Sequence, residues 1–390
     1  MSQNDSFLTG KMTRRDMLKL SAAAGAGAFL AACGAPAAPA KTADELLKSA
    51  NTIPMATLLA EAKKEGTLTT IALPYDWANL GEIIETYKTK YSMKVNGLNP
   101  DAGSSDELEA IRTNKGNKGP TAPDVVDIGI GYTESSKKEG LFSPYKVATW
   151  DTISLKDPDG YWYAEYYGVL GFQVSKAQIK NIPADWSDLL KPEYKNQVAL
   201  AGDVLKSNEA VMAVWAAGMS KTGKADQAAA EEGLKFFAEL KKNGNFTPVI
   251  ATSGTTAKGE TPIALTWDYL GLANRDTLKG NPDVAVVVPK TGLIAGPYAG
   301  AISAYAPHPF AARLWAEHIM SDEGQLMYLK GYAHPIRYND LVAKNKVPAD
   351  LAAKLPPAES YKVAIFPTLE NLTASKKYIT ENWRKVVLGE

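Results

Sequence analysis

Short apolar runs that alternate with helical periods are the feature that most constrains how this chain can fold. A first set of candidate strands lies at residues 67–73, 94–98 and 124–130. A second set lies at residues 168–174, 198–201, 263–265, 284–288 and 298–304. Strands that alternate with helices assemble into sheets whose faces the helices cover. The sequence therefore predicts an α/β protein, and its 390 residues are enough for two domains.

Capping residues mark several helix boundaries. Thr42 and Glu45 have the spacing of a capping box, in which each side chain binds the backbone N–H of the other residue. Pro54 favours the start of a second helix, and Gly66 favours its end. Further helices are expected at residues 80–90, 207–219, 225–242 and 309–331, with a helical tail from residue 339. Ser104-Ser-Asp-Glu107 is expected to cap one more helix.

The N-terminus has the pattern of an export signal. Arg14 and Arg15 precede an apolar run over residues 20–32, which ends in small residues before Cys33. This run is too short to cross a bilayer, and the pattern is typical of a secretory signal peptide. The arginine pair resembles a twin-arginine signal, although Met17 stands where that signal usually has Phe. The plain secretory route stays open.

The segment Leu-Ala-Ala-Cys33 resembles a bacterial lipobox, in which the cysteine is acylated and becomes the first residue of the mature protein. We therefore expect residues 1–32 to be removed and residues 33–41, rich in Ala and Pro, to form a tether. The lipid would then be the only membrane anchor. The alternative is an amphipathic helix with a chance cysteine.

Composition gives no support for nucleic acid binding and excludes an internal disulfide. The net charge is +0, which gives no electrostatic argument for nucleic acid binding. Cys33 is the only cysteine, so the chain has no internal disulfide.

Trp267, Asp268 and Tyr269 form the first candidate site. They follow the candidate strand 263–265 and precede a helix, and ligands of α/β sheets bind at the carboxyl ends of strands. Two aromatic faces beside one carboxylate suit a cation. The alternative is that Asp268 caps the helix while the two rings fill the core.

Several segments occur in a distinctive order. They are Asp157-Pro-Asp-Gly-Tyr-Trp-Tyr163, Tyr167-Gly-Val-Leu-Gly-Phe172, Asp185-Trp-Ser-Asp-Leu-Leu-Lys-Pro-Glu-Tyr194, Gly259 to Tyr269, Ala306-Pro-His-Pro309 and His334-Pro-Ile-Arg337. Together with the lipobox, they resemble the extracytoplasmic solute-binding proteins of ABC importers. The likeness is greatest to the cluster that carries ferric iron, polyamines, phosphonates or thiamine.

This resemblance implies a type II periplasmic-binding-protein fold, an α/β clamp of two lobes that closes over a small-molecule solute. Lobe one would comprise residues 66–165 and 292–334, and lobe two residues 170–290 and 335–390. The chain would act as a monomer without a cofactor. Its closed form would dock on an ABC permease whose ATPase lies inside the cell.

A second acid-and-aromatic pair favours an amine or polyamine as the solute. Asp76 and Trp77 lie in a predicted strand-end loop of lobe one, opposite the first candidate site. Asp76 as a helix cap is the alternative. A candidate strand carries Tyr163, Glu165 and Tyr167 at alternate positions, so these side chains would share one face. That face could form the floor of the cleft, although packing at the hinge would explain the three residues equally well.

Two other ligand types stay open. Ferric binders of this cluster use two adjacent tyrosines where this chain has Thr266 to Asp268, so iron is disfavoured. Ser104, Ser253 and Thr255 lie near helix starts, where hydroxyl and N–H groups bind phosphate or carboxylate. Ordinary helix capping by these residues is the alternative. A zwitterion such as an aminophosphonate could use both kinds of group.

The main alternative from another functional class is that the protein is an enzyme. The sequence has no Gly-x-Ser-x-Gly, His-Glu-x-x-His, P-loop or strand-linked Gly-x-Gly-x-x-Gly motif. We therefore expect a binding protein rather than a secreted hydrolase. A domain that senses its ligand for a receptor stays open.

Overall fold

The computed structural model describes residues 41–355, 361 and 363–390, and it divides into two units, residues 1–46 and 47–390. In the first unit, the backbone N–H of Thr42 donates to Glu45 Oε2 at 2.7 Å, and that of Glu45 donates to Thr42 Oγ1 at 3.3 Å. The predicted capping box is therefore confirmed, and helix α2 (Ala43–Lys48) follows it. The predicted signal peptide, Cys33 and all of the tether except its last residue lie outside the described residues.

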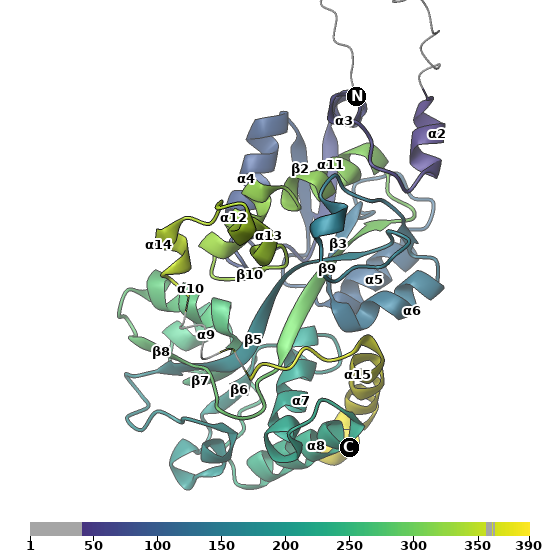
Figure 1. The fold of residues 1–390 in the computed structure, drawn as a ribbon. Coiled ribbons are helices and arrows are strands. Elements are labelled where there is room, and N and C mark those ends of the chain that lie inside the picture. Colours follow the sequence, from purple (N-terminus) through teal and green to yellow (C-terminus); the bar gives the residue numbers. More distant parts are fainter. Residues whose placement is uncertain (1–40, 356–360, 362) are drawn as a thin grey trace, which may run out of the picture. The chain divides into compact units, whose positions relative to one another are not determined.

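Strand β5 connects the two main groups of strands in the second unit. Its first part pairs antiparallel with β9, and its second part pairs antiparallel with β7 and β8. Figure 1 shows β5 and β9 as long neighbouring strands. The strands of this sheet are β3 (Val125–Gly129), β4 (Phe142–Ser143), β5 (Tyr163–Ser175), β6 (Val198–Leu200), β7 (Ile263–Trp267), β8 (Val284–Val287), β9 (Ala295–Ser303) and β10 (His334–Pro335).

A smaller parallel pair, β1 (Thr67–Ile71) and β2 (Lys94–Leu98), stands beside this sheet. The helices that follow or flank the first group of strands are α3 (Met55–Glu65), α4 (Leu80–Tyr91), α5 (Ser104–Thr113), α6 (Thr133–Lys138), α11 (Pro309–Ile319), α12 (Asp322–Lys330), α13 (Tyr338–Ala343) and α14 (Ala349–Ala352). Those near the second group are α7 (Asn208–Thr222), α8 (Gln227–Lys242), α9 (Ser253–Ala257), α10 (Asp268–Leu278) and α15 (Leu369–Trp383). The predicted alternation of strands and helices is confirmed, whereas the lobe boundaries stay a prediction.

Helix α7 is held rigidly against α8 by a close backbone contact. A Cβ atom at Gly218 would lie 1.7 Å from the carbonyl oxygen of Ala229, and one at Gly233 would lie 2.0 Å from that of Val214. Only glycine allows the two helices to approach this closely. Because α7 is buried from Asn208 to Met219, its first turn is fixed in position.

A β-bulge changes which side chains of β5 share a face. The register with β9 shifts by one residue within residues 164–166. The prediction that Tyr163, Glu165 and Tyr167 alternate onto one face is therefore wrong, because an extra residue inverts the alternation beyond it. Tyr166, rather than Tyr167, shares the face of Tyr163.

Candidate functional site

A cavity of about 870 Å³ opens where strand ends and helix starts of both strand groups meet. Its charged wall residues comprise seven carboxylic acids and one lysine: Asp76, Asp101, Asp106, Glu107, Asp127, Asp203, Glu209 and Lys206. The ammonium group of Lys206 lies 3.3 Å from the carboxylate of Asp106 and is therefore already paired. The wall thus has the charge of a site for cations.

Asp127 is a buried acid in which one carboxylate oxygen lacks a hydrogen-bond partner among the described residues. It lies in the middle of β3 with 8% of its surface exposed. Its Oδ2 accepts a hydrogen bond from Tyr166 at 2.7 Å, and Tyr166 in turn accepts one from the indole of Trp77 at 2.6 Å. Among the described residues, Oδ1 has no hydrogen-bond partner. A buried carboxylate oxygen without a donor is costly, unless a ligand supplies one.

Burial also shifts the protonation of the acids around this position. It raises the pKa of Asp127 to about 7, although the hydrogen bond from Tyr166 acts in the opposite direction. It raises the pKa of Glu209 to about 8, against hydrogen bonds from Thr266 and the backbone of Trp267. Burial, followed by the negative charge of Asp127, raises the pKa of Glu107. Burial is the largest cause of all three shifts, because removal from water disfavours the charged form of an acid.

Aromatic rings gather around Tyr166, the hydrogen-bond partner of Asp127. The ring centroid of Trp77 lies 5.5 Å from that of Tyr298 and 5.8 Å from that of Tyr269, both edge to face. Tyr166 stacks on Tyr298 with 5.5 Å between centroids. Trp77 and Tyr298 line the cavity, whereas Tyr166 and Tyr269 lie buried behind them. Two of the predicted site residues, Trp77 and Tyr269, are therefore in contact although 192 positions separate them in the sequence.

The other two residues of the first candidate site lie outside the cavity wall. The indole of Trp267 is fully buried and donates to the Tyr298 hydroxyl at 3.3 Å. Asp268 is 1% exposed, and its two oxygens accept from the backbone N–H of Val169 at 3.0 Å and from the hydroxyl of Tyr361 at 2.8 Å. Its carboxylate thus joins the start of α10 to β5.

Three of the remaining predicted residues line the cavity. Asp76 is exposed in the loop before α4. Ser104 accepts a hydrogen bond from the backbone N–H of Gly129 at 3.1 Å, and Ser253 donates to Asn274 at 2.7 Å. Both serines therefore have protein partners in addition to their place in the wall.

The last four predicted residues are not among those that line the cavity. Thr255 forms a capping box within α9, and Tyr163 is buried. Glu165 accepts from the hydroxyl of Tyr328 at 2.8 Å. The ring of Tyr167 stacks on His334, with 4.8 Å between centroids.

Sequence reasoning missed Asp127, Glu209, Tyr298, Gln173 and Asn274. Asp127 and Gln173 did carry a signal, because each is a polar residue between apolar neighbours in a strand. A buried polar group in such a strand needs a partner, and a ligand can be that partner. Glu209 looked like an ordinary acid in the first turn of a helix.

Comparisons with known proteins agree with this architecture. The profile of the family described as bacterial extracellular solute-binding protein matches residues 121–362. No curated protein matches the sequence. None of the helices among the described residues has the length and apolarity that a membrane crossing needs.

Solved structures of periplasmic binding proteins share the fold. One is AfuA from Actinobacillus pleuropneumoniae with bound fructose-6-phosphate, at 19% identity and a TM-score of 0.63, covering 83% of this chain and 99% of that one. Another, from Listeria monocytogenes, is assigned as a spermidine/putrescine ABC transporter, at 14% identity, a TM-score of 0.61 and coverages of 82% and 99%. A third, AgtB from A. tumefaciens in complex with agropinic acid, has 14% identity, a TM-score of 0.64 and coverages of 83% and 99%.

These similarities establish the two-lobe, mixed α/β fold of type II periplasmic binding proteins. The family profile covers more than half of the sequence, including β3, β5, β7 and β9. The chain belongs to the bacterial extracellular solute-binding proteins.

Proposed function

We propose that this protein captures a small solute with at least one ammonium group and delivers it to the permease of an ABC importer. The observation that carries the proposal is the free Oδ1 of Asp127, buried in a wall where acids outnumber the single, paired lysine. A protonated amine would donate to this oxygen. The faces of Trp77 and Tyr298 would attract the same charge through cation–π interactions.

Binding of such a cation would stabilise the ionised form of Asp127. An unpaired charge in a buried site is unfavourable, and a charge-assisted hydrogen bond from an ammonium group removes that penalty. The Listeria structure assigned to spermidine and putrescine transport has the same fold, which supports polyamine-like amines as the first solutes to test.

Other solutes are less well matched to this wall. An anion or the acidic end of a zwitterion would meet only one lysine, and that lysine is paired with Asp106. For a ferric ion, the residues around the cavity offer no adjacent pair of tyrosines. Within residues 41–355, 361 and 363–390, no three or more His, Cys, Asp or Glu side chains are grouped to hold a metal.

The test compares Asp127→Asn with the parent protein by isothermal titration calorimetry, using putrescine, spermidine and ethanolamine. We expect at least one amine to bind the parent and the variant to lose about 2–4 kcal/mol of binding free energy, because the amide keeps the shape but removes the charge. Equal affinity of both proteins for every amine that binds would refute the proposal.

Asp268→Asn is the matched variant for a carboxylate outside the cavity wall. A lower melting temperature with unchanged affinity would assign Asp268 to the joint between α10 and β5. A loss of affinity as large as that of Asp127→Asn would support the predicted contact between Asp268 and the ligand.

We also propose that the mature protein is a monomer held at the outer face of the membrane through acylated Cys33. Mass spectrometry of protein from the membrane fraction should find a lipid-modified N-terminal cysteine. Cys33→Ala should release the protein from that fraction. A parent protein found only in the soluble fraction, with residues 1–32 removed but no lipid, would contradict the anchor. A dimer in light scattering would contradict the monomer.

The chain is proposed to bind its solute without converting it. Incubation with any amine that binds, followed by mass spectrometry, should return that amine unchanged. A new product whose amount rises with protein concentration would favour the secreted hydrolase instead.

A further inference from the structure

A cluster of uncharged polar side chains lines a second part of the cavity wall. Gln173 lies on β5, Asn274 on α10, and Ser253 and Thr256 on α9. Three elements that are separate in the sequence therefore direct amide and hydroxyl groups to one place. Gln173 is only 2% exposed and stands between the apolar residues Phe172 and Val174.

A chain of hydrogen bonds connects these four side chains. Ser253 donates to Asn274 Oδ1 at 2.7 Å, and Asn274 Nδ2 donates to Gln173 Oε1 at 2.7 Å. Gln173 Nε2 then donates to Thr256 Oγ1 at 2.9 Å. Each amide nitrogen has two hydrogens and uses one of them in this chain. The cluster thus keeps donors, together with hydroxyl acceptors, for a further partner.

The charge of this cluster differs from that around Asp127. None of its four side chains is ionisable, so it has no fixed charge with which to select an ammonium or a carboxylate group. An apolar group would leave the remaining amide hydrogens without acceptors, which is unfavourable in a buried site. A neutral hydroxyl group both donates and accepts, and it therefore matches the unused capacity.

We propose that Gln173, Asn274, Ser253 and Thr256 form a second subsite, which binds a neutral, hydroxyl-bearing part of the solute. The solute would then be a hydroxylated amine, in the class of amino alcohols and aminated sugars, rather than a plain alkyl diamine. This inference rests on the proposed function, because Asp127 holds the amine end.

The experiment uses pairs of probes that differ only in a terminal hydroxyl group. Aminoalkanols with three, six and nine carbons are titrated calorimetrically against alkylamines of the same lengths. At one length or more, we expect the aminoalkanol to bind the parent protein about tenfold more tightly, as one or two added hydrogen bonds would give. No preference for the hydroxyl at any length would overturn the subsite.

Asn274→Ala then tests the residues. It should reduce the affinity for the preferred aminoalkanol about tenfold and leave that for the matching alkylamine within about twofold. Thr255→Ala is the control, because Thr255 lies on the same helix as Ser253 but outside the wall. It should lower the melting temperature and keep the preference for the hydroxyl group.

Ser253→Ala is a milder variant in case Asn274→Ala does not fold. Its affinity for the aminoalkanol should fall about threefold, and its affinity for the alkylamine should not change. If Asn274→Ala and Ser253→Ala weaken both members of a probe pair equally, the cluster serves only to join α9 and α10 to β5. Asp127→Asn distinguishes the two proposals. If Asp127→Asn binds neither probe and the parent protein shows no preference for the hydroxyl group, the second subsite is refuted and the amine site is retained.

Discussion

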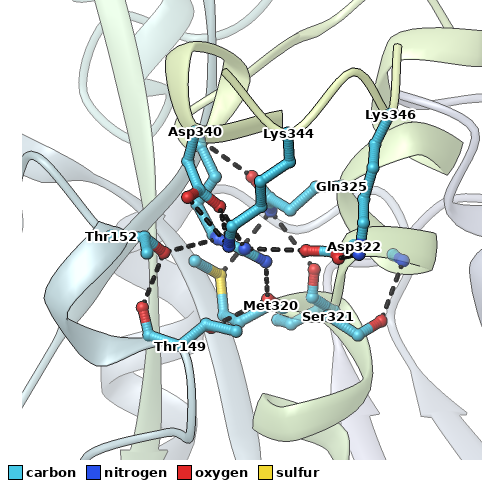
Figure 2. A network of polar contacts seen from close by, with 12 residues as sticks. Thr149, Thr152, Met320, Ser321, Asp322, Gln325, Asp340, Lys344 and Lys346 are labelled. Carbon is cyan, nitrogen blue, oxygen red and sulfur yellow. Dashed lines mark hydrogen bonds and ion pairs between the residues drawn. The ribbon is translucent and has the colours of Figure 1, made fainter. Parts of the chain in front are cut away.

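Two of the buried clusters of ionisable groups in the described part of the chain balance charge in opposite ways. In the first, Arg337 has a completely buried side chain, and its guanidinium makes four hydrogen bonds. Figure 2 shows Thr152, Met320, Asp322 and Asp340, the residues that accept them. Its guanidinium donates to Thr152 Oγ1 at 2.7 Å, to the carbonyl oxygen of Met320 at 2.6 Å, and to Asp322 and Asp340 at 2.7 and 2.5 Å. The chain itself thus supplies two carboxylates to this one buried cation.

The second cluster, around Asp127, lacks this balance. Glu107 and Glu209 are also buried there, and the described cavity wall includes no cation except Lys206, which is paired with Asp106. A buried charge that serves stability is paired within the chain, as Arg337 is. One left unpaired beside a cavity indicates that the partner arrives from outside.

Removal of the cation from the balanced cluster should have the largest effect. Arg337→Met leaves Asp322 and Asp340 without their shared partner, and we expect the free energy of unfolding to fall by about 3–5 kcal/mol. Urea unfolding followed by circular dichroism measures it. Affinity for amines should not change in the folded variant. A loss below about 1 kcal/mol would mean that the balance of this cluster contributes little.

The unbalanced cluster should make the ligand-free protein less stable as pH rises. The folded pKa of Asp127, about 7, exceeds its ordinary value of 3.8, and that of Glu209, about 8, exceeds 4.5. Between about pH 4 and 8 the folded state therefore retains protons that the unfolded chain has released, so stability falls with rising pH. Burial lowers the pKa of His318 to about 4, which acts in the opposite direction below pH 6.5.

Comparison with Asp127→Asn removes the contribution of Asp127 together with its effect on Glu107, whereas His318 and Glu209 are common to both proteins. Between pH 5 and 8 the variant should gain stability relative to the parent by at least the roughly 1.4 kcal/mol that one pKa unit represents. Urea unfolding at several pH values measures this difference. Parallel curves for the two proteins would show that Asp127 is ionised throughout, without penalty.

A smaller effect is expected from the lysine in the cavity wall. Lys206→Met removes a pair whose side chains are 56% and 36% exposed, so stability should change by less than about 1 kcal/mol. Affinity for an amine should rise about twofold to threefold, because one repelling charge is gone. Weaker amine binding in this variant would indicate that Lys206 contacts the solute directly.

The smallest effect should come from the outer part of the balanced cluster. Lys344 lies 2.9 Å from Asp340 with 45% of its side chain exposed. Solvent screens such a pair, and Lys344→Met should cost about 0.5 kcal/mol or less. If this variant is as unstable as Arg337→Met, the comparison between buried and exposed partners of Asp340 fails.

Much of the fold could be predicted because its signals are local. The strand at residues 94–98 and the helix between Pro54 and Gly66 were expected where the structure has them, since capping and periodicity act over a few residues. The bulge in β5 could not be predicted, because it depends on pairing with β9, more than a hundred residues away. It determines that Tyr166 reaches Asp127.

The site was predictable only in part, for a similar reason. An acid next to an aromatic residue in sequence drew attention to Asp76 and Asp268. The aromatic partners of Asp127 come instead from three distant segments, through Trp77, Tyr166 and Tyr298. Which acid faces the cavity depends on the direction of each side chain in the assembled sheet, and adjacency in sequence does not determine that direction.

If the two proposed subsites act together, strand β5 sets a length for the solute. Tyr166, at the amine end, and Gln173, at the hydroxyl end, are both on this strand, and a strand rises about 3.3 Å per residue. Their Cα atoms are therefore separated by roughly 23 Å, a span that the inward-reaching side chains shorten. The preferred solute would be an extended molecule. A compact one such as ethanolamine could reach either the amine site or the hydroxyl subsite, but not both at once.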